Sequence, residues 1–297
     1  MPTATSRPSL RTWVAGARPR TLPAAVVPVA LGAVVGVGQG GARWWTVAPA
    51  LVVSLALQVG VNYANDYSDG IRGTDDSRVG PVRLVASGLA APGAVKRAAF
   101  ASFGVAAVAG LVVAATTSWW LLVVGAASVL AGWFYTGGSH PYGYLGLGEV
   151  FVFVFFGLVA TVGTTFVVLE RLPALTWVLG SVAGCLACAL LVVNNLRDIP
   201  TDREVGKRTL AVRLGDRATR RLYELLLAAA FVLLVVAALI GPVGALAGLA
   251  GVVVAVPAVR AVSGGAVGRD LVAVLGTTGR VQLVVGVLTT AGVAFTA

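Results

Sequence analysis

Long apolar stretches, separated by short polar connections, dominate this chain of 297 residues. They are rich in Val, Leu, Ala and Gly, and they lack the apolar–polar alternation of outer-membrane barrel strands. A stretch of about 20 apolar residues predicts a helix that can cross a bilayer. The predicted spans cover residues 21–39, 46–64, 95–115, 118–135, 149–169, 174–195, 221–240, 243–260 and 281–297. The expected fold is an all-α, polytopic membrane bundle of nine helices that forms one domain, residues 1–297.

The connections between these spans differ in length and polarity. Residues 66–94 and 197–220 form two long polar connections, and residues 136–148 form a shorter, glycine-rich one. With nine spans and the N-terminus inside, all three lie on the inner side, whereas the outer connections are minimal. The sequence therefore predicts that any chemistry takes place at the inner face.

Composition and charge support a membrane location. The chain is 58% hydrophobic and 11% charged, whereas a soluble domain is about 25% charged. Of the 22 basic residues, only Arg43 and Arg171 fall in outer connections. This bias predicts a cytoplasmic N-terminus and cytoplasmic active-site loops by the positive-inside rule. The net charge of +10 is then a topology signal, which makes the lipid bilayer the expected partner and gives no reason to invoke nucleic acid.

Amides and carboxylates concentrate in two short stretches, each at the inner end of a predicted span. At about 100° per residue, Asn62, Asp66 and Asp69 share one helix face, with Asn65 beside them. The second stretch repeats this spacing. Its corresponding residues are Asn194, Asp198 and Asp202. Ionisable groups at membrane depth are costly, and they usually mark a functional site.

The residue types in these stretches indicate a metal–diphosphate site. Four neighbouring carboxylates repel one another unless cations intervene. Oxygen ligands without His or Cys favour Mg²⁺, and interleaved basic residues suit phosphate oxygens. These basic residues are Arg72, Arg197, Arg203, Lys207 and Arg208. Two alternatives stay open: ordinary polar helix ends at the headgroups, and a cation-transport site, against which the interleaved basic residues weigh.

Five segments resemble the UbiA superfamily of intramembrane prenyltransferases. Within that superfamily they are most similar to the branch that prenylates 1,4-dihydroxy-2-naphthoate in menaquinone biosynthesis. The segments are Ala17–Ala24, Asn65–Asp75, Gly80–Gly88, Tyr135–Glu149 and Asn194–Thr209. Two features mark the branch: Gly73 stands where many relatives have a third Asp, and Ser139 and His140 replace a Lys that is typical of 4-hydroxybenzoate enzymes.

The resemblance implies a reaction and a set of residues. A polyprenyl chain passes from polyprenyl diphosphate to 1,4-dihydroxy-2-naphthoate, with loss of diphosphate and CO₂, at the bacterial plasma membrane. Homogentisate and 4-hydroxybenzoate are alternative acceptors. The expected Mg²⁺ ligands are Asp66, Asp69, Asp198 and Asp202, and Tyr135 joins them as a catalytic residue. The expected substrate-binding residues are Asn62, Asn65, Arg72, Arg83, Asn194, Arg197, Arg203, Lys207, Arg208 and His140.

Overall fold

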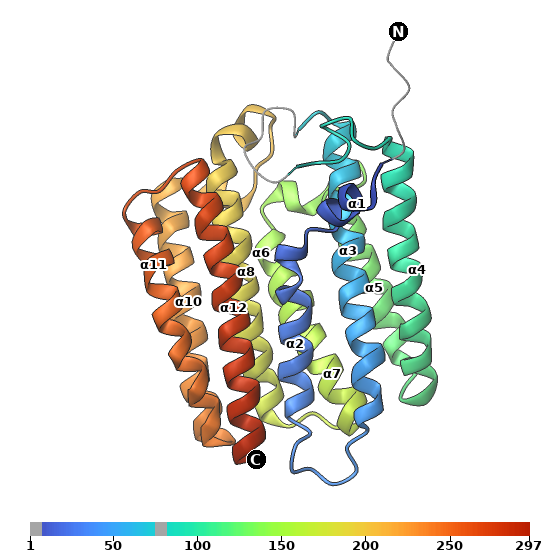
Figure 1. Cartoon of the computed structure of the whole chain (residues 1–297), viewed down its shortest axis with the longest axis vertical. Coiled ribbons are helices and arrows are strands. Elements are labelled where there is room, and N and C mark those ends of the chain that lie inside the picture. Colours follow the sequence, from blue (N-terminus) through green and yellow to red (C-terminus); the bar gives the residue numbers. More distant parts are fainter. Residues whose placement is uncertain (1–7, 75–81) are drawn as a thin grey trace.

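The computed structural model describes residues 8–74 and 82–297 as a bundle of roughly parallel helices (Figure 1). All regular elements in this part of the chain are helical, which confirms the predicted class. The longer elements are α2 (Pro23–Val34), α3 (Val47–Ile71), α4 (Pro92–Thr116), α5 (Trp120–Phe134), α7 (Ala160–Leu169), α8 (Ala174–Glu204), α10 (Asp216–Ile240), α11 (Val252–Ser263) and α12 (Arg269–Thr296). The shorter elements are α1 (Leu10–Ala17), η1 (Pro19–Thr21), η2 (Trp44–Thr46), η3 (Tyr142–Leu145), α6 (Gly148–Val152), η4 (Phe153–Val159), α9 (Leu210–Leu214) and η5 (Val243–Gly251).

Helix length and composition make the chain a multi-pass membrane protein. Within the described residues, seven helical stretches are long and apolar enough to cross a bilayer. Two further predicted spans, 21–39 and 118–135, coincide with the shorter apolar helices α2 and α5, of 12 and 15 residues. α1 lies at one end of the bundle with the long connections, and the last turn of α12 lies at the other end (Figure 1).

Two helices continue well beyond the predicted spans. α3 extends to Ile71 and α8 to Glu204, although the apolar stretches were expected to end at residues 64 and 195. A hydropathy pattern marks where side chains stop being apolar, whereas a helix ends where its backbone hydrogen bonds end. α8 even passes through Pro200, which lies in its last turns. The acidic residues therefore sit on helical backbone rather than in loops.

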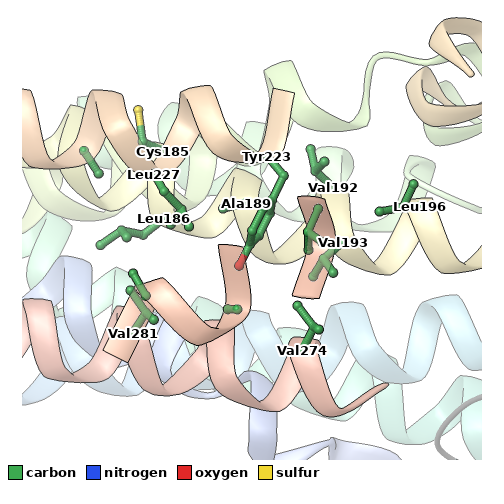
Figure 2. Packing of buried hydrophobic residues seen from close by; sticks show 14 of the residues in the cluster. Cys185, Leu186, Ala189, Val192, Val193, Leu196, Tyr223, Leu227, Val274 and Val281 are labelled. Atoms are coloured by element: carbon green, nitrogen blue, oxygen red, sulfur yellow. The ribbon is translucent and has the colours of Figure 1, made fainter. Parts of the chain in front are cut away.

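α8 is the central helix of one half of the bundle, where it packs against α10 and α12. Figure 2 shows Leu186 and Ala189 of α8 facing Tyr223 of α10 and Val281 of α12 in one buried cluster. Bilayer lipid is as apolar as these side chains, so close packing rather than the hydrophobic effect holds such helices together. The buried Tyr223 hydroxyl adds a hydrogen bond of 2.8 Å to Thr278.

Glycine permits the closest helix contact in this half. A Cβ on Gly244 of η5 would lie 2.0 Å from the carbonyl oxygen of Gly292 on α12. No larger residue fits there without separating the two backbones. The other half is built on α3, which packs against α4 and against α2. The C-terminal ends of α3 and α8 thus belong to two different packing units, and the site forms between them.

Candidate active site

A cavity of about 780 Å³ lies between the helices, with most of its polar residues near the C-terminal ends of α3 and α8 and mainly apolar residues along the rest. Its apolar wall comes from α2, α3, α4, α5, η4 and α7. The polar lining at this end comprises Arg18, Thr21, Gln58, Asn62, Asn65, Asp69, Arg83, Tyr135, Thr136, Tyr142, Tyr144, Asn194, Asn195, Asp198, Asp202, Lys207 and Thr209. Both acidic stretches thus reach one chamber, as their spacing predicts.

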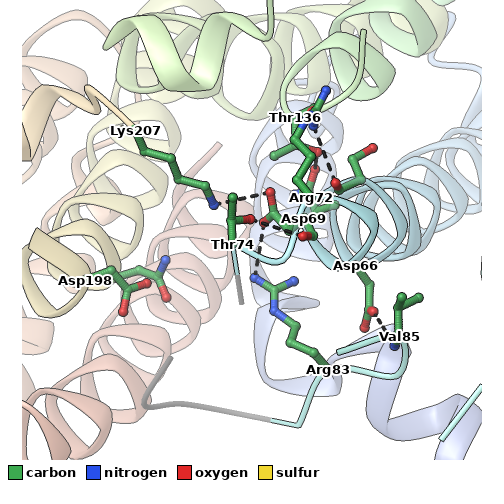
Figure 3. Close-up of polar contacts among 12 residues, drawn as sticks. Asp66, Asp69, Arg72, Thr74, Arg83, Val85, Thr136, Asp198 and Lys207 are labelled. Atoms are coloured by element: carbon green, nitrogen blue, oxygen red, sulfur yellow. Dashed lines mark hydrogen bonds and ion pairs between the residues drawn. The ribbon is translucent and has the colours of Figure 1, made fainter. Parts of the chain in front are cut away.

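Asp69 is the centre of the polar contacts at the C-terminal end of α3 (Figure 3). Its Oδ1 accepts a hydrogen bond of 2.7 Å from the Tyr144 hydroxyl and lies 3.2 Å from Nζ of Lys207. Its Oδ2 lies 3.8 Å from Nη2 of Arg83. Lys207 also lies 4.7 Å from the centre of the Tyr144 ring. One carboxylate therefore joins α3 to the segment before α4, to η3 and to the segment after α8.

Asp66 has a different environment from Asp69, although the two share a helix face. Its side chain is fully buried and does not line the cavity. The backbone N–H groups of Leu84 and Val85 donate to its two oxygens at 2.8 and 3.0 Å. The carboxylate thus holds the segment that carries Arg83 in place. The sequence could not reveal this contact, because the donors are backbone N–H groups.

On α8, Asn194, Asp198 and Asp202 all line the cavity. Nε and Nη2 of Arg197 donate to the two oxygens of Asp198 at 2.7 and 2.8 Å, and Nη2 also reaches Oδ1 of Asn194 at 2.9 Å. This guanidinium is buried. Arg197 therefore orients the acidic face of α8 and does not line the cavity.

Several other predicted residues lie outside the cavity lining. Arg72 donates to the carbonyl groups of Thr136 and Gly138 and lies 5.6 Å from the centre of the Tyr144 ring. The remaining three are exposed at the surface. They are His140, Arg203 and Arg208. Asp75, whose role the sequence leaves open, is outside the described residues.

The two predicted asparagines on α3 combine cavity lining with structural contacts. Nδ2 of Asn62 donates to the carbonyl of Ala17 and to Oγ1 of Thr21, at 2.9 and 3.0 Å. Oδ1 of Asn65 accepts from the Thr136 hydroxyl at 2.8 Å. These amides therefore join the N-terminal segment and the 135–147 loop to α3.

A second polar group lies on the α6 side of the cavity. Tyr135 lines the cavity, and its carbonyl accepts from the Gly143 N–H at 3.0 Å. Asn195, which also lines it, donates from Nδ2 to Oε1 of the buried Glu149 at 3.0 Å. Tyr135 and Asn195 therefore add uncharged polar groups to the cavity lining.

The sequence prediction missed several lining residues, among them Tyr144, Asn195 and Arg18. All three fall inside the segments that carry the resemblance, but their contacts could not be predicted from the sequence. Arg18 looked like one more basic residue of the N-terminal region. Its backbone adopts the left-handed conformation, with φ of 53°, between α1 and η1.

The donor set fits a magnesium–diphosphate complex better than a bare ion. No group of three or more His, Cys, Asp or Glu side chains within residues 8–74 and 82–297 is placed to hold a metal. Mg²⁺ usually takes one or two carboxylates and completes its shell with water and substrate phosphates. Asp69, Asp198 and Asp202 supply such oxygens, and Lys207 and Arg83 supply positive charge beside them.

Comparison with known protein families matches residues 25–268 to the UbiA prenyltransferase family. The chain belongs to this family. It is therefore a prenyltransferase, as the two acidic stretches and their neighbours predicted. The match begins inside α2 and ends at residue 268, just before α12 begins at Arg269.

Curated members of the family extend the match over almost the whole chain. A 1,4-dihydroxy-2-naphthoate octaprenyltransferase of Mycobacterium tuberculosis is 50% identical over 287 residues, which cover 97% of this chain and 98% of the relative. The protein of the same name from Escherichia coli is 36% identical over 231 residues, or 75% of each chain.

Solved structures of the family share the fold. A UbiA homolog from Archaeoglobus fulgidus, bound to GPP and Mg²⁺, superposes with a TM-score of 0.67 at 12% identity. The match covers 94% of this chain and 99% of that one. At this identity the likeness concerns the backbone arrangement alone.

Proposed function

We propose that this prenyltransferase moves a polyprenyl chain from polyprenyl diphosphate to 1,4-dihydroxy-2-naphthoate, releasing diphosphate and CO₂ and giving demethylmenaquinol. The observation that carries the proposal is one continuous cavity whose inner end is acidic and basic and whose remainder is apolar. Such a cavity suits a substrate with a charged head and a long hydrocarbon tail. The names of relatives that are 50% identical support the acceptor.

The charged end is proposed to hold the diphosphate. Asp69, Asp198 and Asp202 would bind Mg²⁺, which supplies positive charge to the leaving oxygens when bound. Lys207 and Arg83 already lie beside Asp69, at 3.2 and 3.8 Å, and are placed to bind phosphate oxygens. Asp66 acts in this scheme by fixing the backbone next to Arg83, rather than as a fourth ligand.

The bond changes balance without another reactant. The carbon–oxygen bond of the donor breaks, and its electron pair leaves with diphosphate. The ring carbon that bears the carboxylate then bonds to the allylic carbon, and loss of CO₂ returns an electron pair to the ring. Tyr135 and Asn195 are placed to orient the ring. The apolar wall excludes water, which would otherwise capture the cation.

We also propose how the chain sits in its membrane. The single domain, residues 1–297, crosses the bacterial plasma membrane nine times, with α2 and α5 as the two short crossings. The N-terminus and the active-site loops face the cytoplasm. The concentration of basic residues at the end of the bundle that carries these loops supports this orientation.

One assay tests the proposal. Purified protein in lipid nanodiscs receives Mg²⁺, a polyprenyl diphosphate and, in turn, 1,4-dihydroxy-2-naphthoate, homogentisate or 4-hydroxybenzoate. We expect product and CO₂ with the naphthoate only, loss of turnover with EDTA, and recovery with added Mg²⁺. Turnover that continues unchanged in EDTA would refute the assignment of Mg²⁺. Preference for another acceptor would refute 1,4-dihydroxy-2-naphthoate as the substrate. Cation flux in proteoliposomes without any prenyl donor would indicate a transporter instead.

A further inference from the structure

Four glycines on α-helices line the cavity: Gly110 of α4, Gly125 of α5, Gly163 of α7 and Gly132 of α5. A Cβ built on Gly125 or Gly163 meets no heavy atom within 4 Å, and one built on Gly110 meets only Val53, at 3.9 Å. By contrast, a Cβ on Gly132 of α5 would lie 2.7 Å from Val61. The first three glycines are therefore not required for helix packing. They leave space in the cavity.

These positions lie deep in the cavity, away from Asp69. At a rise of about 1.5 Å per residue, Gly125 is about 14 Å from the inner end of α5 at Phe134. By the same measure, Gly163 is about 22 Å beyond Gly148, where α6 begins at the charged end. A geranyl tail bound through its diphosphate at the charged end stops short of this depth. A tail of many isoprene units reaches it.

We propose that Gly125 and Gly163 determine how long a prenyl tail this enzyme accepts. The inference rests on the proposed function and adds a specificity determinant to it. A larger side chain at either position would project into the space through which a long tail passes, and would leave the space beside the diphosphate unchanged. The absence of a side chain at these two positions is then what admits long donors.

The substitutions can be made without breaking the fold. Both glycines lie inside helices and neither has a positive φ. Replacing a glycine in a helix interior with Leu removes a conformational penalty rather than adding one. Gly104 of α4 offers a matched control. A Cβ there also meets nothing within 4 Å, but Gly104 is exposed and does not line this cavity.

The experiment compares Gly125→Leu, Gly163→Leu and Gly104→Leu with the unaltered chain in nanodiscs. Initial rates are measured with geranyl, geranylgeranyl and octaprenyl diphosphate at saturating acceptor. For Gly125→Leu and Gly163→Leu we expect kcat/KM for the octaprenyl donor to fall by about tenfold or more, because the tail meets an overfilled space. We expect the geranyl donor, and all donors with Gly104→Leu, to be unaffected.

A binding measurement separates this inference from the proposed function. The rise in melting temperature on adding each diphosphate is recorded without acceptor, so it does not depend on the acceptor being right. We expect the octaprenyl-induced rise to shrink in Gly125→Leu and Gly163→Leu and to persist in Gly104→Leu. Equal losses for geranyl and octaprenyl diphosphate, or an unchanged octaprenyl response, would overturn the inference. The unaltered chain could bind the longer donors and yet transfer no prenyl group to any acceptor. That result would contradict only the proposed function.

Discussion

Replacing Asp66 with Asn should destabilise the enzyme even though the two side chains have nearly the same shape. The Asp66 carboxylate accepts hydrogen bonds of 2.8 and 3.0 Å from the backbone N–H groups of Leu84 and Val85. Asn has one oxygen and one NH₂ group. In either orientation, one backbone N–H then faces another donor. The site is fully buried, so water cannot take the place of the lost acceptor.

The magnitude follows from the contact that is lost. A hydrogen bond to a charged group contributes about 1.5–3 kcal/mol to stability. Chains of some 200 residues change melting temperature by about 2–4 °C per kcal/mol, so we expect a fall of about 3–12 °C. The melting temperature of Asp66→Ala should fall further, because this substitution removes both hydrogen bonds. Arg83 should also lose its place beside Asp69, which raises KM for the diphosphate donor.

The assay is thermal unfolding in nanodiscs, followed by donor kinetics at a temperature where every variant is folded. Asp270→Asn is the matched control, because it makes the same chemical change at an exposed residue in the first turn of α12. We expect its melting temperature to stay close to that of the unaltered chain. If Asp66→Asn and Asp270→Asn melt at the same temperature, Asp66 does not hold the backbone as argued above.

Three further predictions concern the charged end of the cavity. Asp198→Asn should abolish transfer and lower the free energy of unfolding by about 3–5 kcal/mol, since it weakens the partner of the buried Arg197; near-normal turnover would contradict this. Lys207→Met should raise KM for polyprenyl diphosphate and leave KM for the acceptor unchanged, and steady-state kinetics with each substrate varied would expose the opposite pattern. Burial, and then the charge of Asp69, raise the pKa of the Tyr144 hydroxyl. Its contribution to stability is therefore complete below about pH 10, the ordinary Tyr pKa, and is lost above it. The melting-temperature gap between the unaltered chain and Tyr144→Phe should narrow as the pH rises past that value, and a constant gap would count against the assignment.

Much of the bundle could be predicted from the sequence, because hydropathy reports directly on which segments enter lipid. The helix ends could not be predicted in this way. α3 and α8 continue through polar residues that have partners inside the protein, such as Leu84 N–H for Asp66 and Arg197 for Asp198. α12 begins at Arg269, although its apolar stretch was expected to start at residue 281. Arg280 is exposed on that helix, where a long basic side chain can extend toward the headgroups.

Helical periodicity predicted which acidic residues share a face, but not what each of them contacts. Asp66 and Asp69 are three residues apart, yet one binds backbone N–H groups and the other binds Tyr144 and Lys207. The sequence does not show which backbone N–H groups will donate to a side chain. Arg72 is a similar case. It was predicted to bind phosphate, and in the structure it donates to two backbone carbonyl groups of the 136–138 segment, which the sequence does not reveal.

The cavity joins a charged end to an apolar remainder, and this has a consequence for the direction of the reaction. One product is a polyanion that dissolves only in water, and the other is a neutral hydrocarbon-rich quinol that dissolves only in lipid. After release, the two are diluted into different phases and rarely meet again at the enzyme. Mass action therefore opposes the back reaction without any extra device in the protein. In detergent micelles, where this partition is weaker, product inhibition should be stronger than in a continuous bilayer.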